Sequence, residues 1–236
     1  MNTTKRSILL KLSGEIFTYY QPKMIPVIDH IASQIAILNS KATIGIVVGG
    51  GNIFRGSEHG MNLGLPAADG HEIGMLATLI NGRVLQAKLQ TKQVSSTLLS
   101  ALHCPSIAHT IAQEKIHQCI RTNTCMIFVG GIGSPYFTTD TTAMIRALQI
   151  GTREIWKITK VDGVYSDDPL QNKNAVRYQD ISYQKALDAQ LNIVDSTALT
   201  LGKRQDLRLR VFSYKEKNSL LTAFEDPTYG SSIKNS

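Results

Sequence analysis

A run of three glycines followed by an arginine stands where a buried strand is expected to end. Residues 44–48 are apolar and β-branched, which is typical of a strand buried on both faces of a parallel sheet. Gly49–Gly51 follow at once, and Arg55 comes four residues later. Glycine lets a ligand approach backbone N–H groups, and arginine can fork onto phosphate oxygens. The stretch therefore predicts a phosphate-binding turn. A tight strand–helix turn without a ligand is the alternative, because neither G-x-G-x-x-G nor G-x-x-x-x-G-K-[ST] occurs here.

Three more expected strands end in residues of the same chemical character. Lys11 lies inside an apolar run, where a charge is uncommon unless it is paired or functional. Ligands of open α/β sheets bind outside the carboxyl ends of strands. Phosphoryl transfer needs cations, N–H donors and carboxylates that hold Mg²⁺. We therefore expect one phosphoryl-transfer site built from several strand ends, with an edge-strand role as the alternative for Lys11. The segments concerned are 11–14, 49–55, 130–140 and 159–168.

Composition restricts the class of protein. A chain of 236 residues with 42% hydrophobic and 18% charged residues suits one α/β domain of the larger kind, or two small lobes that share a sheet. We expect a single domain over residues 1–236. The formal charge of +7 favours anionic ligands such as nucleotides. Nucleic acid is not an expected partner, because no long basic block or interleaved aromatic array occurs. Three cysteines without a C-x-x-C pair indicate reduced thiols in a cytoplasmic protein. No stretch reaches the roughly 20 apolar residues of a membrane helix.

Alternating strands and helices must position these segments. Periodicity of 2 and of 3.6 predicts a largely parallel sheet with helices between its strands. The segment 94–110 is consistent with a short strand or a short helix. A loop is expected over 57–70, with Thr139 or Asp140 as a helix N-cap and a loose tail after Glu225. The expected strands are 7–12, 44–48, 125–129, 154–158 and 207–212, and the expected helices are 24–40, 71–90, 111–120, 141–150, 183–190 and 198–202.

Five motifs resemble those of the bacterial uridylate kinases, a branch of the amino acid kinase family. They are KLSGE at 11–15, GGGNIFRG at 49–56, GMLAT at 74–78, PYFTTD at 135–140 and KVDGVY at 160–165. The resemblance extends from about residue 6 to residue 215. It implies a three-layer αβα sandwich around a mostly parallel sheet, the amino acid kinase fold. It also implies transfer of the ATP γ-phosphoryl group to UMP to give UDP, with Mg²⁺, in a cytoplasmic homohexamer.

The resemblance also implies roles for individual residues. Lys11, Arg55, Asp140 and Asp195 would be catalytic, with the two aspartates organising Mg²⁺ and Lys11. A helix cap for Asp140 and a solvated turn for Asp195 are the alternatives. No residue is assigned as a direct metal ligand. The ATP site would comprise Lys11, Leu12, Ser13, Gly14, Gly51, Arg55, Thr159, Tyr165 and Asp168. The UMP site would comprise Gly50, His71, Ile132, Gly133, Ser134, Pro135, Tyr136, Phe137, Thr138 and Thr139.

The chain departs from the family pattern on the acceptor side. Ile132 and Ser134 stand where threonine and asparagine are usual, and His71 stands where an aspartate is usual. We expect an extended loop to place Asp69 or His71 on the ribose of UMP, with neither residue doing so as the alternative.

Regulation and acceptor are also open to other interpretations. The segment 16–23 is short and lacks glycine, and the following long helix carries Gln86 and Gln90 beside Arg83. Neutral amides bind a triphosphate poorly, so we expect little activation by GTP. A relative that phosphorylates another acceptor, such as a carboxylate or a phosphonate, is the first alternative function. A regulatory or storage protein that binds nucleotide without turnover is the second.

Overall fold

A sheet of nine strands forms the centre of the part of the chain that the structure describes. The computed structural model describes residues 5–18, 21–169, 171–191 and 193–235. Neighbouring strands are parallel except where β11 runs antiparallel to β10. A separate hairpin pairs β7 (Val164–Tyr165) with β8 (Arg177–Tyr178). In spatial order the sheet comprises β4 (His109–Thr110), β3 (Ser96–Ser100), β5 (Cys125–Val129), β2 (Thr43–Val48), β1 (Ser7–Leu12), β6 (Glu154–Thr159), β10 (Arg208–Ser213), β11 (Ser231–Lys234) and β9 (Asp180–Ser182).

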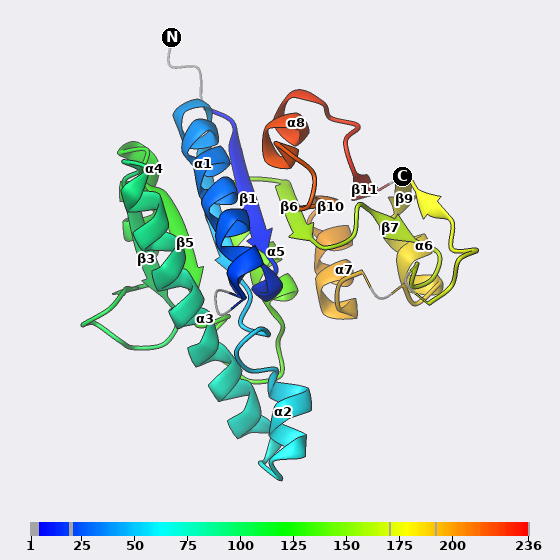
Figure 1. Ribbon diagram of the computed structural model, residues 1–236, viewed down its shortest axis with the longest axis horizontal. Helices are drawn as coiled ribbons and strands as arrows, with labels where there is room; N and C mark the ends of the chain where they lie inside the picture. The colour runs from blue at the N-terminus through cyan, green and yellow to red at the C-terminus, as the bar shows by residue number, and fades with distance from the viewer. Residues whose placement is uncertain (1–4, 19–20, 170, 192, 236) are drawn as a thin grey trace.

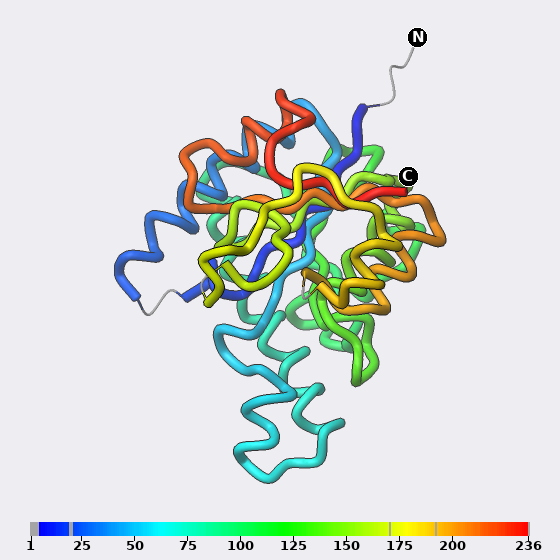
Figure 2. Tube along the Cα trace, turned by 90° about the vertical axis from the view of Figure 1, so that its right-hand side faces the viewer, coloured from blue at the N-terminus to red at the C-terminus, as the bar shows by residue number. Residues whose placement is uncertain are grey.

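Helices cover both faces of the sheet, because successive side chains of a strand point to opposite faces. In β1, Leu10 packs in the core beneath α1 and α3, whereas Leu9 packs beneath α5 and α7. Figure 1 shows the arrangement, and Figure 2 separates α1 from the α6–α7 pair across the sheet. The fold is therefore the expected three-layer sandwich. One layer contains α1 (Ile25–Lys41), α3 (Ala67–Thr91) and α8 (Ser219–Glu225), and the other contains α4 (Gln113–Arg121), α5 (Thr139–Gln149), α6 (Tyr183–Asp188) and α7 (Ser196–Arg204).

Most of the segment expected to be a loop over 57–70 is helical, so that expectation is wrong. The helix α2 (Gly56–Asn62) packs on the start of α3, and the pair projects beyond the sheet in Figures 1 and 2. A Cβ on Gly70 would lie 2.6 Å from the carbonyl oxygen of Gly56. Glycine at this contact allows the close approach of the two helices. Gly60 and Gly70 therefore serve helix packing, whereas Gly64, with a φ of 67°, lies in the short turn between the two helices.

The chain end also differs from its expectation. The tail after Glu225 was expected to be loose, yet β11 lies between β10 and β9, and Ile233 is fully buried. The buried guanidinium of Arg210 donates to the carbonyl oxygens of Ala223, Asp226 and Tyr229 at 2.7–2.8 Å. These contacts hold the segment between α8 and β11 against the sheet. The polar composition of the tail gave no sign of this tertiary pairing.

Shorter elements complete the fold. The segment 94–110 forms β3 and β4, and the helix expected from residue 111 begins at Gln113. After β1 the chain forms two 3₁₀ turns, Gly14–Phe17 and Pro22–Met24. Residues 19 and 20 of the segment expected to be short, 16–23, lie outside the described residues. No helix in the described ranges is long and apolar enough to cross a membrane.

Candidate active site

The carboxyl ends of four neighbouring strands meet at one edge of the sheet. β5, β2, β1 and β6 are adjacent and parallel, so the turns that follow them lie side by side. The N–H of Gly49 donates to the carbonyl oxygen of Leu12 at 2.9 Å, and the N–H of Ser13 donates to that of Ile158 at 3.1 Å. The side chain of Leu12 is buried in the core, so this residue meets the turns through its backbone. The predicted convergence of strand ends is confirmed.

Two lysines and one aspartate form the centre of this edge. Nζ of Lys11 lies 2.8 Å from Oδ1 of Asp140, and Nζ of Lys157 lies 2.8 Å from Oδ2. The lysines are register partners on β1 and β6. Strand alternation places both on the sheet face that α5 covers, and Asp140 stands in the first turn of α5. We call Lys11, Asp140 and Lys157 the lysine–aspartate cluster.

The cluster carries one cation more than it has carboxylates to pair with. Burial raises the pKa of Asp140, but the charges and hydrogen bonds of Lys11 and Lys157 outweigh it and hold that pKa at about 2. Burial lowers the pKa of Lys157, and Asp140 opposes that shift. Lys157 also donates to the carbonyl oxygen of Ile193. Two ammonium groups that share a single carboxylate leave a net positive charge at the strand ends. This charge favours the binding of an anion.

Asp195 is a structural acceptor at the start of α7. Its carboxylate accepts from Oγ1 of Thr138 at 2.5 Å, from Oγ1 of Thr141 at 2.8 Å and from the N–H of Ala198 at 2.9 Å. The alternative of a solvated turn residue is therefore wrong. The helix-cap alternative for Asp140 is wrong as well, because the cap of α5 is Thr138, whose Oγ1 accepts from the N–H groups of Asp140 and Thr141. Thr139 is the first helical residue and does not cap the helix.

The glycine turn after β2 packs closely on the turn after β1. A Cβ on Gly49 would lie 2.7 Å from the nitrogen of Gly14, and a Cβ on Gly14 would lie 2.9 Å from that of Gly51. Only glycine permits this spacing, so backbone N–H groups of both turns stay close to the cluster. Nδ2 of the fully buried Asn81 donates to the carbonyl oxygen of Gly49 at 2.7 Å and fixes the turn from α3.

Three charged side chains lie at the outer side of these turns. Oε1 of Glu15 is 3.7 Å from Nη2 of Arg55 and 3.4 Å from Nζ of Lys160. Arg55 also approaches Glu58 at 3.9 Å. Because these contacts are long and exposed, they cost little to break. The side chains of Arg55 and Lys160 can therefore turn toward an anion that binds at these turns.

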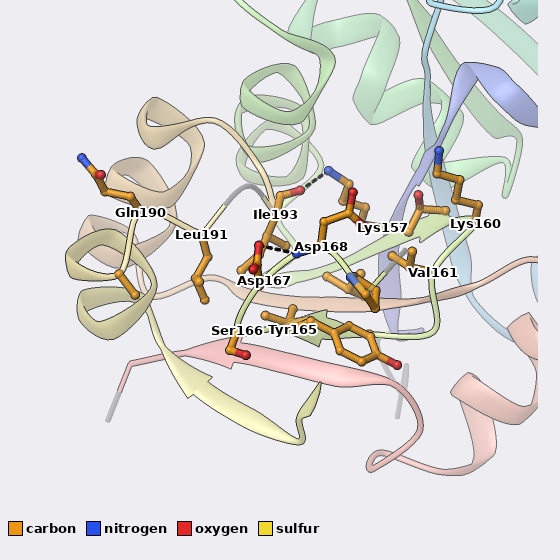
Figure 3. A pocket seen from close by; sticks show the side chains of 16 residues that line it. Lys157, Lys160, Val161, Tyr165, Ser166, Asp167, Asp168, Gln190, Leu191 and Ile193 are labelled. Carbon is orange, nitrogen blue, oxygen red and sulfur yellow. Dashed lines mark hydrogen bonds between the residues drawn. The ribbon is translucent and has the colours of Figure 1, made fainter. Parts of the chain in front are cut away.

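A pocket of about 470 Å³ opens beside the cluster, and Figure 3 shows its lining. Thr159, Tyr165 and Asp168, all expected to contact ATP, line it together with Lys157. Figure 3 labels Tyr165, Asp168 and Lys157 in this lining. The Tyr165 hydroxyl donates to Asp162 at 2.8 Å. The size is within the usual range for a pocket that holds a small ligand.

The residues expected to form the UMP site lie between β5, α5 and α3. Gly50 packs on α3, where a Cβ would lie 2.8 Å from the carbonyl oxygen of Gly74. The rings of His71 and Tyr136 are 5.1 Å apart, and Tyr136 has a φ of 71°. Asp69 is exposed in the first turn of α3 and not in a loop, so the extended loop expected to carry it inward is absent from the described residues. The remaining members, 132–135 and 137–139, follow β5 and lead into α5.

Sequence reasoning missed Lys157, Asn81 and Thr141. Lys157 had a signal, because it interrupts the apolar strand EIWKIT as Lys11 interrupts SILLKL. Asn81 and Thr141 had none, because a polar residue within a helix is ordinary until its partners are known. Their hydrogen bonds to Gly49 and Asp195 depend on the tertiary structure.

Comparison with known proteins supplies the family. A model of the amino acid kinase family matches residues 6–213. The chain belongs to the amino acid kinase family. Among family members it is similar to the uridylate kinase of Protochlamydia amoebophila, with 40% identity over 241 residues that cover 99% of this chain and 94% of that protein. It is also 38% identical over 227 residues to the uridylate kinase of Mycoplasma genitalium, covering 94% of this chain and 93% of that one.

Solved structures of the family have the same fold. The UMP kinase from Ureaplasma parvum matches with a TM-score of 0.90 and 34% identity, over 98% of this chain and 99% of that one. The UMP kinase from Bacillus anthracis matches with a TM-score of 0.90 and 27% identity, over 98% and 96% of the two chains. The three-layer αβα architecture is therefore that of the UMP kinases.

Proposed function

We propose that this amino acid kinase transfers the γ-phosphoryl group of ATP to UMP, giving UDP and ADP. The names of the similar proteins support this activity. The observation in this chain that carries it is the lysine–aspartate cluster, in which Lys11 and Lys157 meet Asp140 at 2.8 Å. Phosphoryl transfer has little covalent chemistry for the protein to perform and depends on positioned positive charge.

The cluster acts on the charge that develops during transfer. Lys11 and Lys157 neutralise the equatorial oxygens of the moving group, and Asp140 keeps the two ammonium groups apart and aimed. Because these side chains are only 10–15% exposed, their charges act in a medium less polar than water and need little reorganisation. Asp195 holds α7 and the start of α5 in place through Thr141. No side chain has to act as a nucleophile.

The two nucleotides approach the cluster from its two sides. We place ATP against the pocket of Figure 3, and UMP against α3 and the loop after β5. Gly14, Gly51 and Ser13 offer backbone donors to ATP, and Arg55 moves from Glu15 to phosphate oxygens. Thr159, Tyr165 and Asp168 contact the donor nucleotide. On the acceptor side the contacts come from Gly50, His71, Ile132, Gly133, Ser134, Pro135, Tyr136, Phe137, Thr138 and Thr139.

Mg²⁺ fits this site as a companion of ATP. The described residues contain no group of three histidine, cysteine, aspartate or glutamate side chains that could enclose a metal ion. Both oxygens of Asp140 are engaged by lysines, and those of Asp195 by hydroxyl and N–H donors. Mg²⁺ commonly binds through substrate phosphates and one or two carboxylates. When bound, it would neutralise phosphate charge, and Asp140 and Asp195 are the carboxylates that would help to hold it.

We also propose a cytoplasmic homohexamer built from chains that each act as one domain. Leu76 and Ile80 lie four residues apart on α3 with exposed fractions of 54% and 48%. Such a pair on one helix face favours burial against another copy. Light scattering on the purified protein tests the assembly, and a monomeric mass would contradict it.

An acceptor screen tests the activity. The protein is incubated with ATP and Mg²⁺ plus UMP, CMP or acetylglutamate, and release of ADP is followed. We expect UMP to give the highest kcat/KM. A preference for the carboxylate acceptor would overturn the assignment in favour of another small-molecule kinase. No release with any acceptor, together with nucleotide binding, would indicate a binding protein without turnover.

A further inference from the structure

Arg146 is a buried cation that the phosphoryl-transfer cluster does not use. It lies on α5 with an exposed fraction of 5%. Its Nη1 donates to Oε1 of Gln149 at 2.7 Å, and its Nη2 donates to the carbonyl oxygen of Gly131 at 3.1 Å. The guanidinium also stands 5.7 Å from the centre of the Phe128 ring. Burial lowers the pKa of Arg146 to about 10, and no described carboxylate forms an ion pair with it. Burying a cation among neutral partners is costly, so stability alone does not explain this residue.

A second buried arginine shows what a structural role looks like in the same fold. Arg210 is 1% exposed, donates to three carbonyl oxygens, and has Glu154 at 3.8 Å. Its contacts hold the end of α8 and the segment that follows it, which contain none of the residues proposed to contact a substrate. Arg146 instead donates a hydrogen bond to the turn after β5, and the residues of the proposed acceptor site follow directly after that turn.

That turn is held from two sides. Gly130 and Gly131 have φ values of 74° and 58°. Oγ1 of Thr78 on α3 accepts from the N–H of Gly130 at 2.7 Å, and Arg146 on α5 donates to the carbonyl oxygen of Gly131. The N–H and C=O of a trans peptide point in opposite directions. The bond from Arg146 therefore directs the N–H of Ile132 away from α5.

The N–H of Ile132 is free to meet a ligand. No hydrogen bond to it occurs within the described part of the chain. Because the side chain of Ile132 is apolar, this N–H is the residue's one polar donor. A cationic donor on the carbonyl side of a peptide group polarises its N–H and strengthens the bond that this N–H makes.

We propose that Arg146 is a positioning residue for the acceptor: through the Gly131 carbonyl it orients and polarises the Gly131–Ile132 peptide, whose N–H donates to an oxygen of the acceptor nucleotide. The inference rests on the proposed function and adds a specific determinant of acceptor binding to it. The oxygen belongs either to the base or to the phosphate or sugar. Both have the same acceptor chemistry, and the experiment separates them.

Steady-state kinetics and UMP binding by titration calorimetry on Arg146→Gln and Arg146→Lys test the proposal. A lost hydrogen bond of this kind predicts an increase of about tenfold in the KM and Kd for UMP in Arg146→Gln. KM for ATP and kcat should stay near wild type. Arg146→Lys keeps a cationic donor that can reach the Gly131 carbonyl. Its KM and Kd for UMP should therefore lie between those of the wild type and those of Arg146→Gln. If the base supplies the oxygen, the ratio of kcat/KM for UMP and CMP changes, and otherwise both fall together.

Arg210→Gln is the matched control, because it should lower the melting temperature and leave the KM for UMP unchanged. A folded Arg146→Gln with wild-type KM and Kd for UMP would overturn the proposal, as would an equal rise in the KM for ATP. If Arg146→Gln does not fold, wild-type UMP affinity in Arg146→Lys overturns it and a weakened affinity supports it. Calorimetry keeps this test separate from the proposed function, since UMP binding is measurable even without turnover.

Discussion

The lysine–aspartate cluster and the acceptor loop, residues 130–139, lie next to each other and are built in opposite ways. The cluster consists of side chains from two central strands and a first helical turn, joined by ion pairs of 2.8 Å. The acceptor loop contains four residues with positive φ, and Tyr136 within it is 68% exposed. Its shape depends on hydrogen bonds between the loop backbone and the side chains of Thr78 and Arg146.

The difference follows from what each region does in the proposed reaction. Charge stabilisation requires groups that are already in place, so it is best built on the rigid sheet. The residues that recognise an acceptor can vary in sequence, and loops that are held by a rigid scaffold tolerate such variation. The residues at which the motifs depart from the pattern they resemble, Ile132, Ser134 and His71, all lie on the proposed acceptor side, whereas Lys11 and Asp140 match that pattern.

Removal of a cluster cation should have the largest effect. We expect Lys11→Ala and Lys157→Ala each to lower kcat by on the order of 10²-fold or more, because each removes a preorganised charge from the transition state. The KM for UMP should change much less. Lys115→Ala, on the surface of α4, is the control and should be silent. Near wild-type kcat in Lys11→Ala would refute the role of that lysine, and such a result in both variants would refute the cluster.

Loss of the central carboxylate should affect stability as well as rate. Asp140→Asn leaves two ammonium groups without a buried partner, which costs about 3 kcal/mol of unfolding free energy. Because the pKa of Asp140 in the folded protein is about 2, below its ordinary value of 3.8, its contribution is present above about pH 4 and is lost as the pH falls toward 2. Urea unfolding across this pH range measures both effects.

Asp206→Asn is the control for that experiment, since Asp206 forms an exposed pair with Arg153. We expect it to change stability by less than about 1 kcal/mol at any pH. An Asp140→Asn protein as stable as wild type at neutral pH would contradict the buried ion-pair account of the cluster.

Changes at the acceptor side should be smaller and specific to UMP. His71 touches the loop through Tyr136, whereas Asp69 is exposed, so we expect His71→Ala to raise the KM for UMP about fivefold. If His71 accepts from a ribose hydroxyl, discrimination against dUMP weakens as well. Steady-state kinetics with both acceptors measures this, and ATP kinetics should not change.

Asp69→Ala separates the two residues that the sequence proposed for the ribose, and Glu72→Ala is an exposed neighbour that serves as control. Wild-type UMP/dUMP ratios in both the His71 and the Asp69 variant would mean that another group holds the ribose.

The smallest effect expected is that of GTP. The Gln86 amide donates to the carbonyl oxygen of Ser96 and accepts from Arg83 at 3.4 Å, so that amide is already engaged and Arg83 is the cation beside it on this face of α3. A triphosphate would find little to bind there. Stimulation of the UMP reaction by sub-millimolar GTP should stay below about twofold. A several-fold increase would show that an effector site exists elsewhere on the molecule.

The sequence by itself determined the largely parallel sheet with helices between its strands and the four strand ends, because both depend on local patterns, whereas the three-layer arrangement was implied by the family motifs. Buried strands are apolar runs, glycines follow them, and a lysine inside such a run is conspicuous. The same reasoning would have found Lys157. The family motifs then added the roles of Asp140 and Asp195, whose local sequences allowed a helix cap and a turn.

Only the tertiary structure decided which groups meet. Lys11 and Lys157 are far apart in sequence, and the register of β1 with β6 together with the first turn of α5 places both on Asp140. The Gly/Ala/Pro-rich segment that reads as a loop becomes α2 and the start of α3, because its glycines allow two helices to touch. The tail becomes β11 because Arg210 and the strand edge of β10 supply partners that no local pattern encodes. Contacts between distant residues depend on the packed arrangement of the elements, and packing is a property of the whole chain.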